Sequence, residues 1–291
     1  KRAGYALEKW EFLKDYKYSV IFTCDDFSST LKKAKEIIPL ENTYENDYLY
    51  TSFVKPVAYS MDGYYFLKFN LAYAAIHPLT QEEFLTKYPF LVVFHEKGEL
   101  IEFRFDVLKR VFLSDKKEPT IYSNLIAEMS DYFKEHFECD LIPLNLDFMV
   151  NVCKRDENVK LIAQSMKLPN GGNAQLDVGN NQEYILPFIG ELRSLLNDNQ
   201  AELEKVPDFR EALEQFMFEM EEMSDYPWIE LLWENEIKTR SNRVKFVFNY
   251  MNKSYCLIQY YYSNVLIGME RMNYVIEYIV NHRNDDTTQN E

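Results

Sequence analysis

The sequence predicts an α+β fold in which antiparallel β-hairpins are covered by helices, and three observations support this class. Short runs of β-branched and aromatic residues recur in pairs that are separated by turn residues, as in hairpins. Other segments carry apolar residues three and four positions apart, as in amphipathic helices. Strands and helices do not alternate regularly, so a doubly wound parallel sheet is the second choice.

The N-terminal half opens with a strand from Tyr18 to Cys24 that leads into a helix from Phe27 to Ile38. Two acids, Asp25 and Asp26, stand at the junction. Carboxylates in this position can cap the free N–H groups of the helix, or they can bind a metal ion and act as acid and base. Capping is the favoured interpretation, because acidic residues are common at helix N-termini for dipole reasons alone.

Residues 48–70 predict a first hairpin, in which two extended segments are joined by a turn that contains Gly63. The segment from Thr80 to Glu83 has the letters of a capping box. It predicts a short helix that ends before Pro89.

The second hairpin has strands from Phe90 to His95 and from Leu100 to Asp106. Apolar and charged residues alternate along its second strand, in the order Ile101, Glu102, Phe103, Arg104, Phe105 and Asp106. Successive strand residues point to opposite faces. We therefore expect the apolar three to be buried and the charged three to face water.

A helix is predicted from Pro119 to Phe137, and a domain boundary is placed just after it. The predicted domains are 1–138, of α+β type, and 139–291, which is rich in helices and ends in a polar tail that frays from residue 283. The second domain begins with a hairpin over 159–178, whose turn holds the only glycine pair of the chain.

Helices are predicted to dominate from Pro187 to Glu234, and the most regular one runs from Asp208 to Met223. Its apolar residues, which we expect to pack into the core, are Phe209, Leu213, Phe216, Met220 and Met223. Another hairpin follows over 245–262. The last predicted element is a terminal helix with the apolar stripe Val265, Met269, Met272, Ile276 and Ile279.

Composition limits the function. The 291 residues are 47% apolar, but no apolar run approaches the 18 residues that a membrane span needs, and no secretory signal opens the sequence. We therefore expect a cytosolic protein. Its 47 acids against 32 bases give a net charge of −15, which works against polyanion binding by the whole molecule. Frequent Lys, Asn, Ile, Tyr and Phe are typical of an AT-rich genome, so a bacterial or phage source is expected.

No catalytic signature is present. With only 8 glycines and 4 histidines, the chain has no phosphate-binding glycine loop, no dinucleotide fingerprint and no zinc-protease motif, and no motif identifies a family. His136, Cys139 and Cys153 offer three zinc ligands without a fourth, so we expect neither a metal nor a cofactor. Glu236 and Lys238, with Asp225 upstream, have the letters of a nuclease core, but they stand in a polar stretch and not on a buried strand.

The segment from Ala201 to Asp225 is strongly acidic, with nine acids against two bases. Its simplest interpretation is a solvated helix face, and its functional interpretation is a docking face for a basic partner. Phe218 falls off the main apolar stripe, which suggests either deeper burial of this helix or contact with another subunit. The leading hypothesis is a non-enzymatic member of a protein assembly, either with a partner or with itself. The residues predicted to bind are Glu211, Phe218, Glu219 and Glu222.

The alternative is a nucleic-acid binder or nuclease-like effector. A basic segment precedes a tyrosine-rich hairpin, and this combination of cations and rings suits single strands, whose stacked bases contribute about 1 to 3 kcal/mol each. The residues predicted for this role are Lys238, Arg240, Arg243, Lys245, Tyr260 and Tyr262.

Overall fold

The computed structural model describes residues 2–42, 49–61, 63–77, 79–108, 120–169, 171–180, 183, 185–234, 241–261 and 268–283. It confirms the α+β class with antiparallel strand pairing. Contacts group the chain into two compact units. The first unit contains residues 1–145 and 250–291, and the second contains 146–249. The predicted domain boundary after residue 138 stays a prediction.

The first unit is built on a sheet in which the neighbouring strands follow the order β2-β3-β4-β5-β1-β11, with β6 also paired to β1. All of these pairs are antiparallel. In chain order the strands are β1 (Tyr18–Thr23), β2 (Val57–Met61), β3 (Tyr64–Ile76), β4 (Glu83–His95), β5 (Leu100–Phe105), β6 (Ile142–Pro143) and β11 (Leu257–Tyr260). The first and second predicted hairpins are therefore confirmed as β2–β3 and β4–β5.

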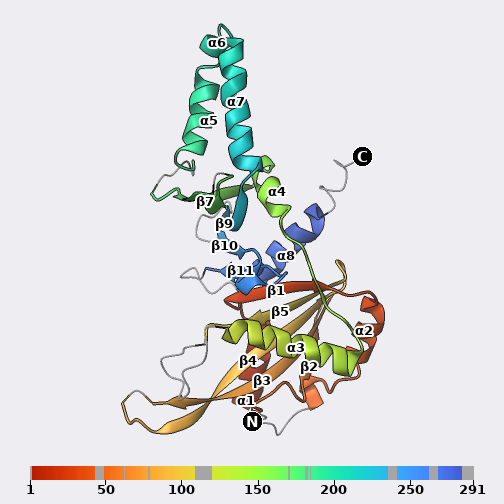
Figure 1. Ribbon diagram of the computed structural model, residues 1–291. Helices are drawn as coiled ribbons and strands as arrows, with labels where there is room; N and C mark the ends of the chain where they lie inside the picture. Colours follow the sequence, from red (N-terminus) through yellow and green to blue (C-terminus); the bar gives the residue numbers. More distant parts are fainter. Residues whose placement is uncertain are drawn as a thin grey trace. The chain divides into compact units, whose positions relative to one another are not determined.

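Helices cover both faces of this sheet (Figure 1). They are α1 (Arg2–Leu13), α2 (Phe27–Ala34), α3 (Ile121–Phe137) and α8 (Glu270–His282), with short 3₁₀ turns at Leu40–Asn42 and Tyr250–Asn252. On one face Phe133 of α3 packs against Phe103 of β5, with ring centroids 5.7 Å apart. On the other face Phe12 of α1 packs against Phe66 of β3, and Arg104 of β5 bonds Asn273 of α8. The predicted α2 and α3 are thus confirmed.

The prediction that three charged residues of the second hairpin face water is wrong for two of them. Glu102 and Arg104 have no exposed surface, because α8 covers the face that the alternation assigns to water. Glu102 Oε2 lies 2.6 Å from Arg104 Nη2 and 2.8 Å from His95 Nε2. Burial alone would raise the pKa of the Glu102 carboxyl, but the Arg104 charge and the His95 hydrogen bond outweigh it and hold that pKa below its usual value. Burial lowers the pKa of His95.

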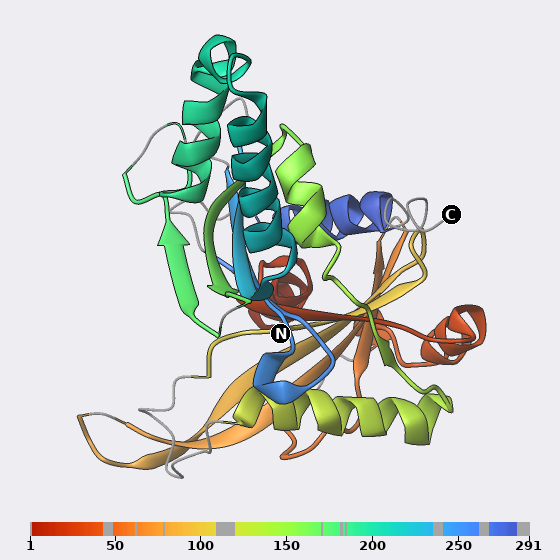
Figure 2. The same ribbon diagram turned by 45° about the horizontal axis from the view of Figure 1, so that its top comes forward.

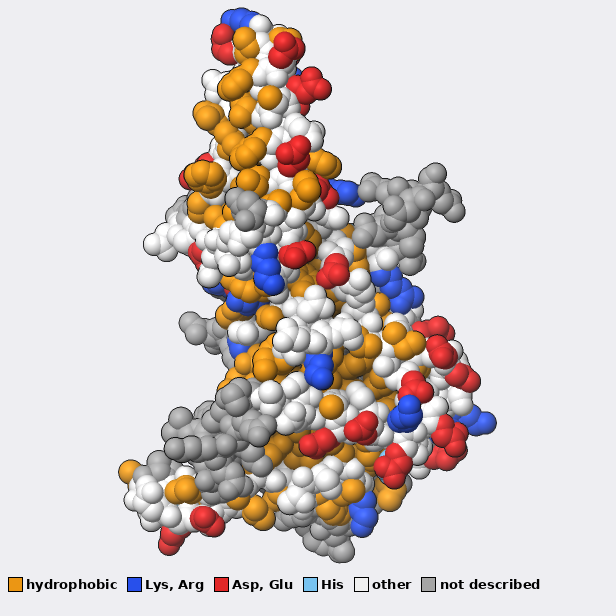
Figure 3. Space-filling view, viewed as in Figure 1, with side chains coloured by type: hydrophobic (Ala, Val, Ile, Leu, Met, Phe, Trp, Pro, Cys, Tyr) orange, Lys and Arg blue, Asp and Glu red, His pale blue; other side chains and the backbone are white. Residues whose placement is uncertain are grey.

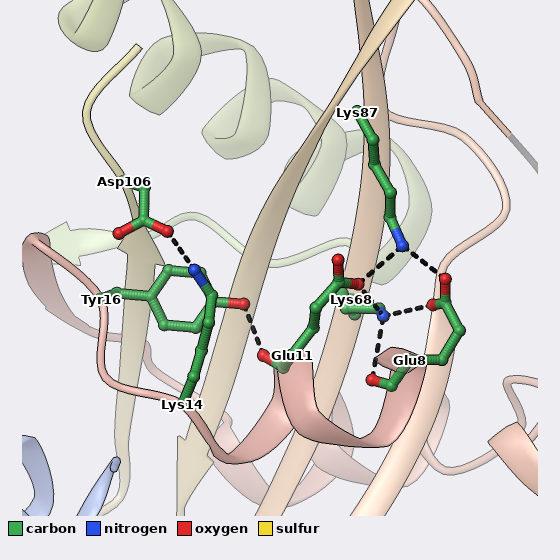
Figure 4. Close-up of polar contacts among 7 residues, drawn as sticks. All are labelled: Glu8, Glu11, Lys14, Tyr16, Lys68, Lys87 and Asp106. Carbon is green, nitrogen blue, oxygen red and sulfur yellow. Dashed lines mark hydrogen bonds and ion pairs between the residues drawn. The ribbon is translucent and has the colours of Figure 1, made fainter. Parts of the chain in front are cut away.

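A second buried ionic cluster fastens α1 to the sheet (Figure 4). Lys68 of β3 is fully buried, and its Nζ lies 2.6 Å from Glu11 Oε2. Lys87 of β4 bonds the same oxygen at 2.7 Å, and both lysines also pair with Glu8. Each buried charge therefore faces opposite charges, which offsets the cost of removing it from water.

The helix predicted from Thr80 is wrong, because β4 begins at Glu83 and pairs with β3 without interruption as far as Ile76. The capping-box residues instead close the turn between the strands. Glu82 N donates to Thr80 Oγ1 at 3.4 Å, and the amide of His77 donates to the carbonyl of Glu82 at 2.9 Å. The many main-chain hydrogen bonds between β3 and β4 stabilise the strand more than a capping box stabilises a helix, because the capping box favours only one helical turn.

The second unit has a sheet with the strand order β10-β9-β7-β8, and its pairs are antiparallel. The strands are β7 (Val159–Lys167), β8 (Asn173–Asp177), β9 (Asp225–Trp233) and β10 (Asn242–Val247), and the helices are α4 (Met149–Arg155), α5 (Ile189–Asp198), α6 (Gln200–Leu203) and α7 (Pro207–Glu222). The β7–β8 hairpin confirms the prediction. Helix predicted as far as Glu234 is wrong after Glu222, because Pro227 and the buried, alternating Ile229 and Leu231 suit a strand.

The closing elements agree with the sequence. Strands β10 and β11 and helix α8 are present, and the predicted stripe residues Met269, Met272, Ile276 and Ile279 are buried. Val265 and the tail from residue 284 lie outside the described residues. Within the part of the chain that the structure describes, no helix combines the length and the apolar content that a membrane crossing requires.

Candidate partner-binding surface

Residues 187–224 of the second unit form a helical hairpin, which we call the arm. Helices α5 and α7 run side by side along it, and α6 stands at its tip (Figures 1 and 2). Pro207 occupies the first turn of α7. The backbone N–H groups of a first turn have no partner within the helix, so the missing N–H of proline costs no hydrogen bond there. Arg193 of α5 forms an ion pair with Glu221 of α7. Lys154 of α4 lies 3.8 Å from Glu222 at the C-terminal end of α7.

The arm exposes much of its apolar surface. Helices α5 and α6 contain no buried residue, and α7 contains one, Met217. Large apolar side chains that are between 48% and 77% exposed occur along the whole arm: Phe188, Leu195, Val206, Phe209, Phe216, Phe218 and Met223. Figure 3 shows hydrophobic side chains gathered along the hairpin on the face turned to the viewer. Contiguous exposed apolar surface of this kind marks interaction sites in proteins.

The expectation that the α7 stripe belongs to the core is therefore wrong. Phe209, Phe216 and Met223 are at least half exposed, while Leu213 and Met220 are half-buried. The physical reason is geometric, since two paired helices can cover only the faces that they turn to each other. An apolar stripe that is wider than this contact stays in water unless another element covers it.

The charge of the arm is strongly negative, with ten acids against three bases. Each base already pairs with an acid of the arm: Arg193 with Glu221, Lys205 with Glu202, and Arg210 with Glu214. The remaining carboxylates therefore keep a negative field around the apolar surface. Such a field attracts cationic groups and repels polyanions.

The four residues predicted to bind a partner all lie on α7. Phe218 is 59% exposed, which agrees with its place off the main stripe. Glu211 is exposed, Glu219 accepts a hydrogen bond from Gln215 Nε2 at 2.9 Å, and Glu222 is exposed beside Lys154. The structure thus puts them on one surface helix, and their role in binding stays a prediction.

Sequence reasoning missed other apolar residues of this surface. They are Phe188 and Leu195 on the α5 side, Phe209 and Phe216 of α7, and Met223 at the C-cap of α7. A signal was present in α7, where a regular apolar stripe accompanies six acids in sixteen residues. Periodicity alone cannot reveal the difference, because a stripe that packs into a core and one that awaits a partner have the same spacing.

The described residues among those predicted for nucleic-acid contact are paired with other side chains or buried. Lys238, Arg240 and Tyr262 lie outside the described residues. Arg243 forms an ion pair with the buried Glu230, and Lys245 Nζ lies over the ring of Trp228, 3.5 Å from its centroid. Tyr260 has no exposed surface, so its ring is covered in the first unit. Stacking of bases needs an accessible ring face.

The candidate metal residues have local structural partners. Asp26 caps α2, because its Oδ1 accepts a hydrogen bond from the Ser29 amide at 2.8 Å, which confirms the capping interpretation. His136 stacks on Tyr132, and the Cys153 thiol donates to the Val150 carbonyl. Asp225 begins β9, whereas Glu236 and Lys238 lie outside the described residues. Among the described residues, no three His, Cys, Asp or Glu side chains are grouped to hold a metal ion.

Neither a scan against known protein families nor a search of curated proteins found a match to this sequence.

Proposed function

We propose that the chain is a non-enzymatic member of a cytosolic protein assembly and that it binds a protein partner through the arm. One observation carries the proposal: seven large apolar side chains of an acidic two-helix arm are about half exposed or more. Complete burial of a large apolar side chain contributes about 1.5 to 3 kcal/mol. Burial of these side chains against a partner therefore contributes favourable free energy to binding.

The arm also has almost no core of its own, so its exposed apolar side chains do not pack inside it. Met217 is its one buried helix residue, and the apolar side chains of α5 are half-buried or exposed. Helices gain most of their stability from packing of an apolar face. Coverage of that face by a partner is the simplest way to complete the packing.

Site-specific cross-linking tests the proposal. A photoreactive phenylalanine analogue replaces Phe216 in the full-length chain, and the matched control carries it at Ile38, which is 59% exposed in the first unit. After irradiation in the cells that make the protein, we expect one defined protein adduct at position 216. An equal pattern of adducts at the two positions would contradict a specific surface on the arm.

Charge reversal tests the acidic part of the surface. We expect Glu211→Lys, Glu219→Lys and Glu222→Lys together to abolish the adduct from position 216, since opposite charges speed encounter and fix orientation. The control reverses three exposed acids of α3, Glu128, Asp131 and Glu135, and should keep it. An adduct that survives reversal on the arm would remove the acidic side chains from the account.

The nucleic-acid alternative stays a separate prediction, and titration of the full chain with labelled single strands tests it. Phosphate contacts release counterions, so true binding must weaken steeply as salt rises. Binding that is absent at low salt would end this alternative.

A further inference from the structure

The spacing of the exposed residues on α7 indicates the shape of the partner. Phe209, Phe216 and Met223 stand seven residues apart and are each at least half exposed. Seven residues make almost two full helical turns, so the three side chains form a nearly straight stripe. At 1.5 Å per residue this stripe is about 21 Å long.

The other helix of the arm repeats this spacing. Phe188, at the N-cap of α5, and Leu195 are seven residues apart and are 77% and 58% exposed. Apolar residues repeated every seven positions are the pattern with which helices pack along one another. An extended strand would present its side chains every 6.7 Å or so, which does not match a repeat of about 10.5 Å. The stripe therefore fits a helix better than a strand.

Charges at the border of the stripe indicate the composition of that helix. Glu219 is three residues after Phe216 and four before Met223, so it is a surface neighbour of both. The three bases of the arm are already paired with its acids. A partner that covers the stripe must therefore bring its own cations to the acidic border. Lys and Arg beside the apolar seam of a helix meet this need, because their long side chains can reach past it.

A second copy of the arm fits poorly. Two arms, each with ten acids and three bases, would bring like charges together along the whole contact. Like-charge contact costs affinity and slows encounter. The same argument disfavours a nucleic acid on this surface.

We infer that the arm binds a basic amphipathic α-helix of about three heptads, which lies along the exposed stripe of α7. This inference rests on the proposed function and names the class of partner. It places the apolar side of the bound helix on Phe209, Phe216 and Met223, and its cations toward carboxylates such as Glu219.

A synthetic helix tests the inference with the full-length protein. The probe is a fluorescent 21-residue peptide with Leu at the two seam positions of each heptad and Lys at the flanking positions. One control peptide carries Glu in place of Lys, and a second has the same composition as the probe in scrambled order. Fluorescence anisotropy measures binding at low and moderate salt. We expect the basic helix to bind at least about tenfold more tightly than either control, and more weakly as salt rises.

Matched variants locate the binding. Phe209→Ser with Phe216→Ser should weaken binding of the basic helix about tenfold or more, because both apolar contacts are lost. Ile38→Ser with Phe84→Ser, which changes two exposed side chains of the first unit, should leave binding unchanged. Equal binding of the scrambled peptide, or equal binding by the arm variant, would overturn the inference.

The two proposals can fail separately. If position 216 still captures a protein partner but the basic helix binds no better than the scrambled peptide, the inference is wrong and the proposed function survives. If neither experiment succeeds, both are wrong. If sedimentation velocity shows a dimer that the arm variant abolishes, a second copy occupies the surface and the basic helix is overturned.

Discussion

Helices α3 and α7 have nearly the same length and the same kind of apolar stripe, yet they differ in what covers them. Of the 17 residues of α3, nine are buried, whereas α7 buries one of 16. Phe133 of α3 is fully buried against Phe94 and Phe103, while Phe216 of α7 is half exposed. A stripe becomes core only where a second layer lies against it. Among the described residues no such layer covers the exposed stripe of the arm, and we propose that a partner supplies it.

Replacing equivalent aromatic residues should show the contrast most strongly. We expect Phe133→Ala to lower the free energy of unfolding by about 4 kcal/mol, because it removes a buried ring and leaves a cavity. Phe216→Ala should change it by less than about 0.5 kcal/mol, since Phe216 is 50% exposed to water. Urea unfolding followed by circular dichroism measures both. Equal losses would show that α7 has a core role like that of α3.

The loss of unfolding free energy on removing an ion pair should likewise differ between a buried pair and an exposed pair. Glu102→Ala leaves Arg104 buried without its carboxylate, and we expect it to cost about 3 kcal/mol. In the arm, Glu202→Ala removes an exposed pair with Lys205 and should cost at most about 0.5 kcal/mol. The same unfolding measurement applies. A small effect at Glu102 would mean that water reaches the first unit more freely than the burial indicates.

Acid should weaken the first unit through the buried cluster on β4 and β5. Burial lowers the pKa of His95, so the unfolded chain takes up a proton first, and stability falls as pH drops below about 6.5. The lowered pKa of Glu102 adds a further loss below about pH 4.5. Urea midpoints between pH 7.5 and pH 5 should therefore decrease. His95→Gln should flatten this decrease, and an unchanged decrease would show that His95 does not cause it.

The smallest expected effect concerns the cap of α2. Asp26→Ala should lower the free energy of unfolding by about 1 kcal/mol, because the Ser29 amide loses its acceptor. Asp25→Ala is the matched control and should have a smaller effect, since Asp26 provides the cap. If Asp25→Ala proves the more destabilising variant, the assignment of the cap is wrong.

Local patterns predicted those elements whose evidence is local. The β2–β3, β4–β5 and β7–β8 hairpins and helices α2, α3 and α8 follow from turn residues and from spacing. The burial of Glu102 and Arg104 could not be predicted in this way, because a helix more than 160 residues away in sequence covers them. The strand that replaces the helix predicted at Thr80 depends likewise on pairing with β3.

The candidate site was predictable only in part. Charge and the displaced Phe218 pointed to α7, and the structure shows those residues exposed. The assignment of Phe209, Phe216 and Met223 to a core failed because hydrophobic spacing reports amphipathicity and not the identity of the covering element. Burial is a property of the whole fold, because it depends on elements that are distant in the sequence.

The most direct test of the central claim compares the wild-type chain with the Phe209→Ser, Phe216→Ser variant by size-exclusion chromatography of extracts from the cells that produce it. The unfolding midpoints of the two purified proteins serve as a check on folding. We expect the wild-type chain to migrate in a complex with a partner and the equally stable variant to migrate alone. A variant that stays in the same complex would contradict binding through the arm, and one that unfolds would contradict the claim that these side chains do not stabilise the fold.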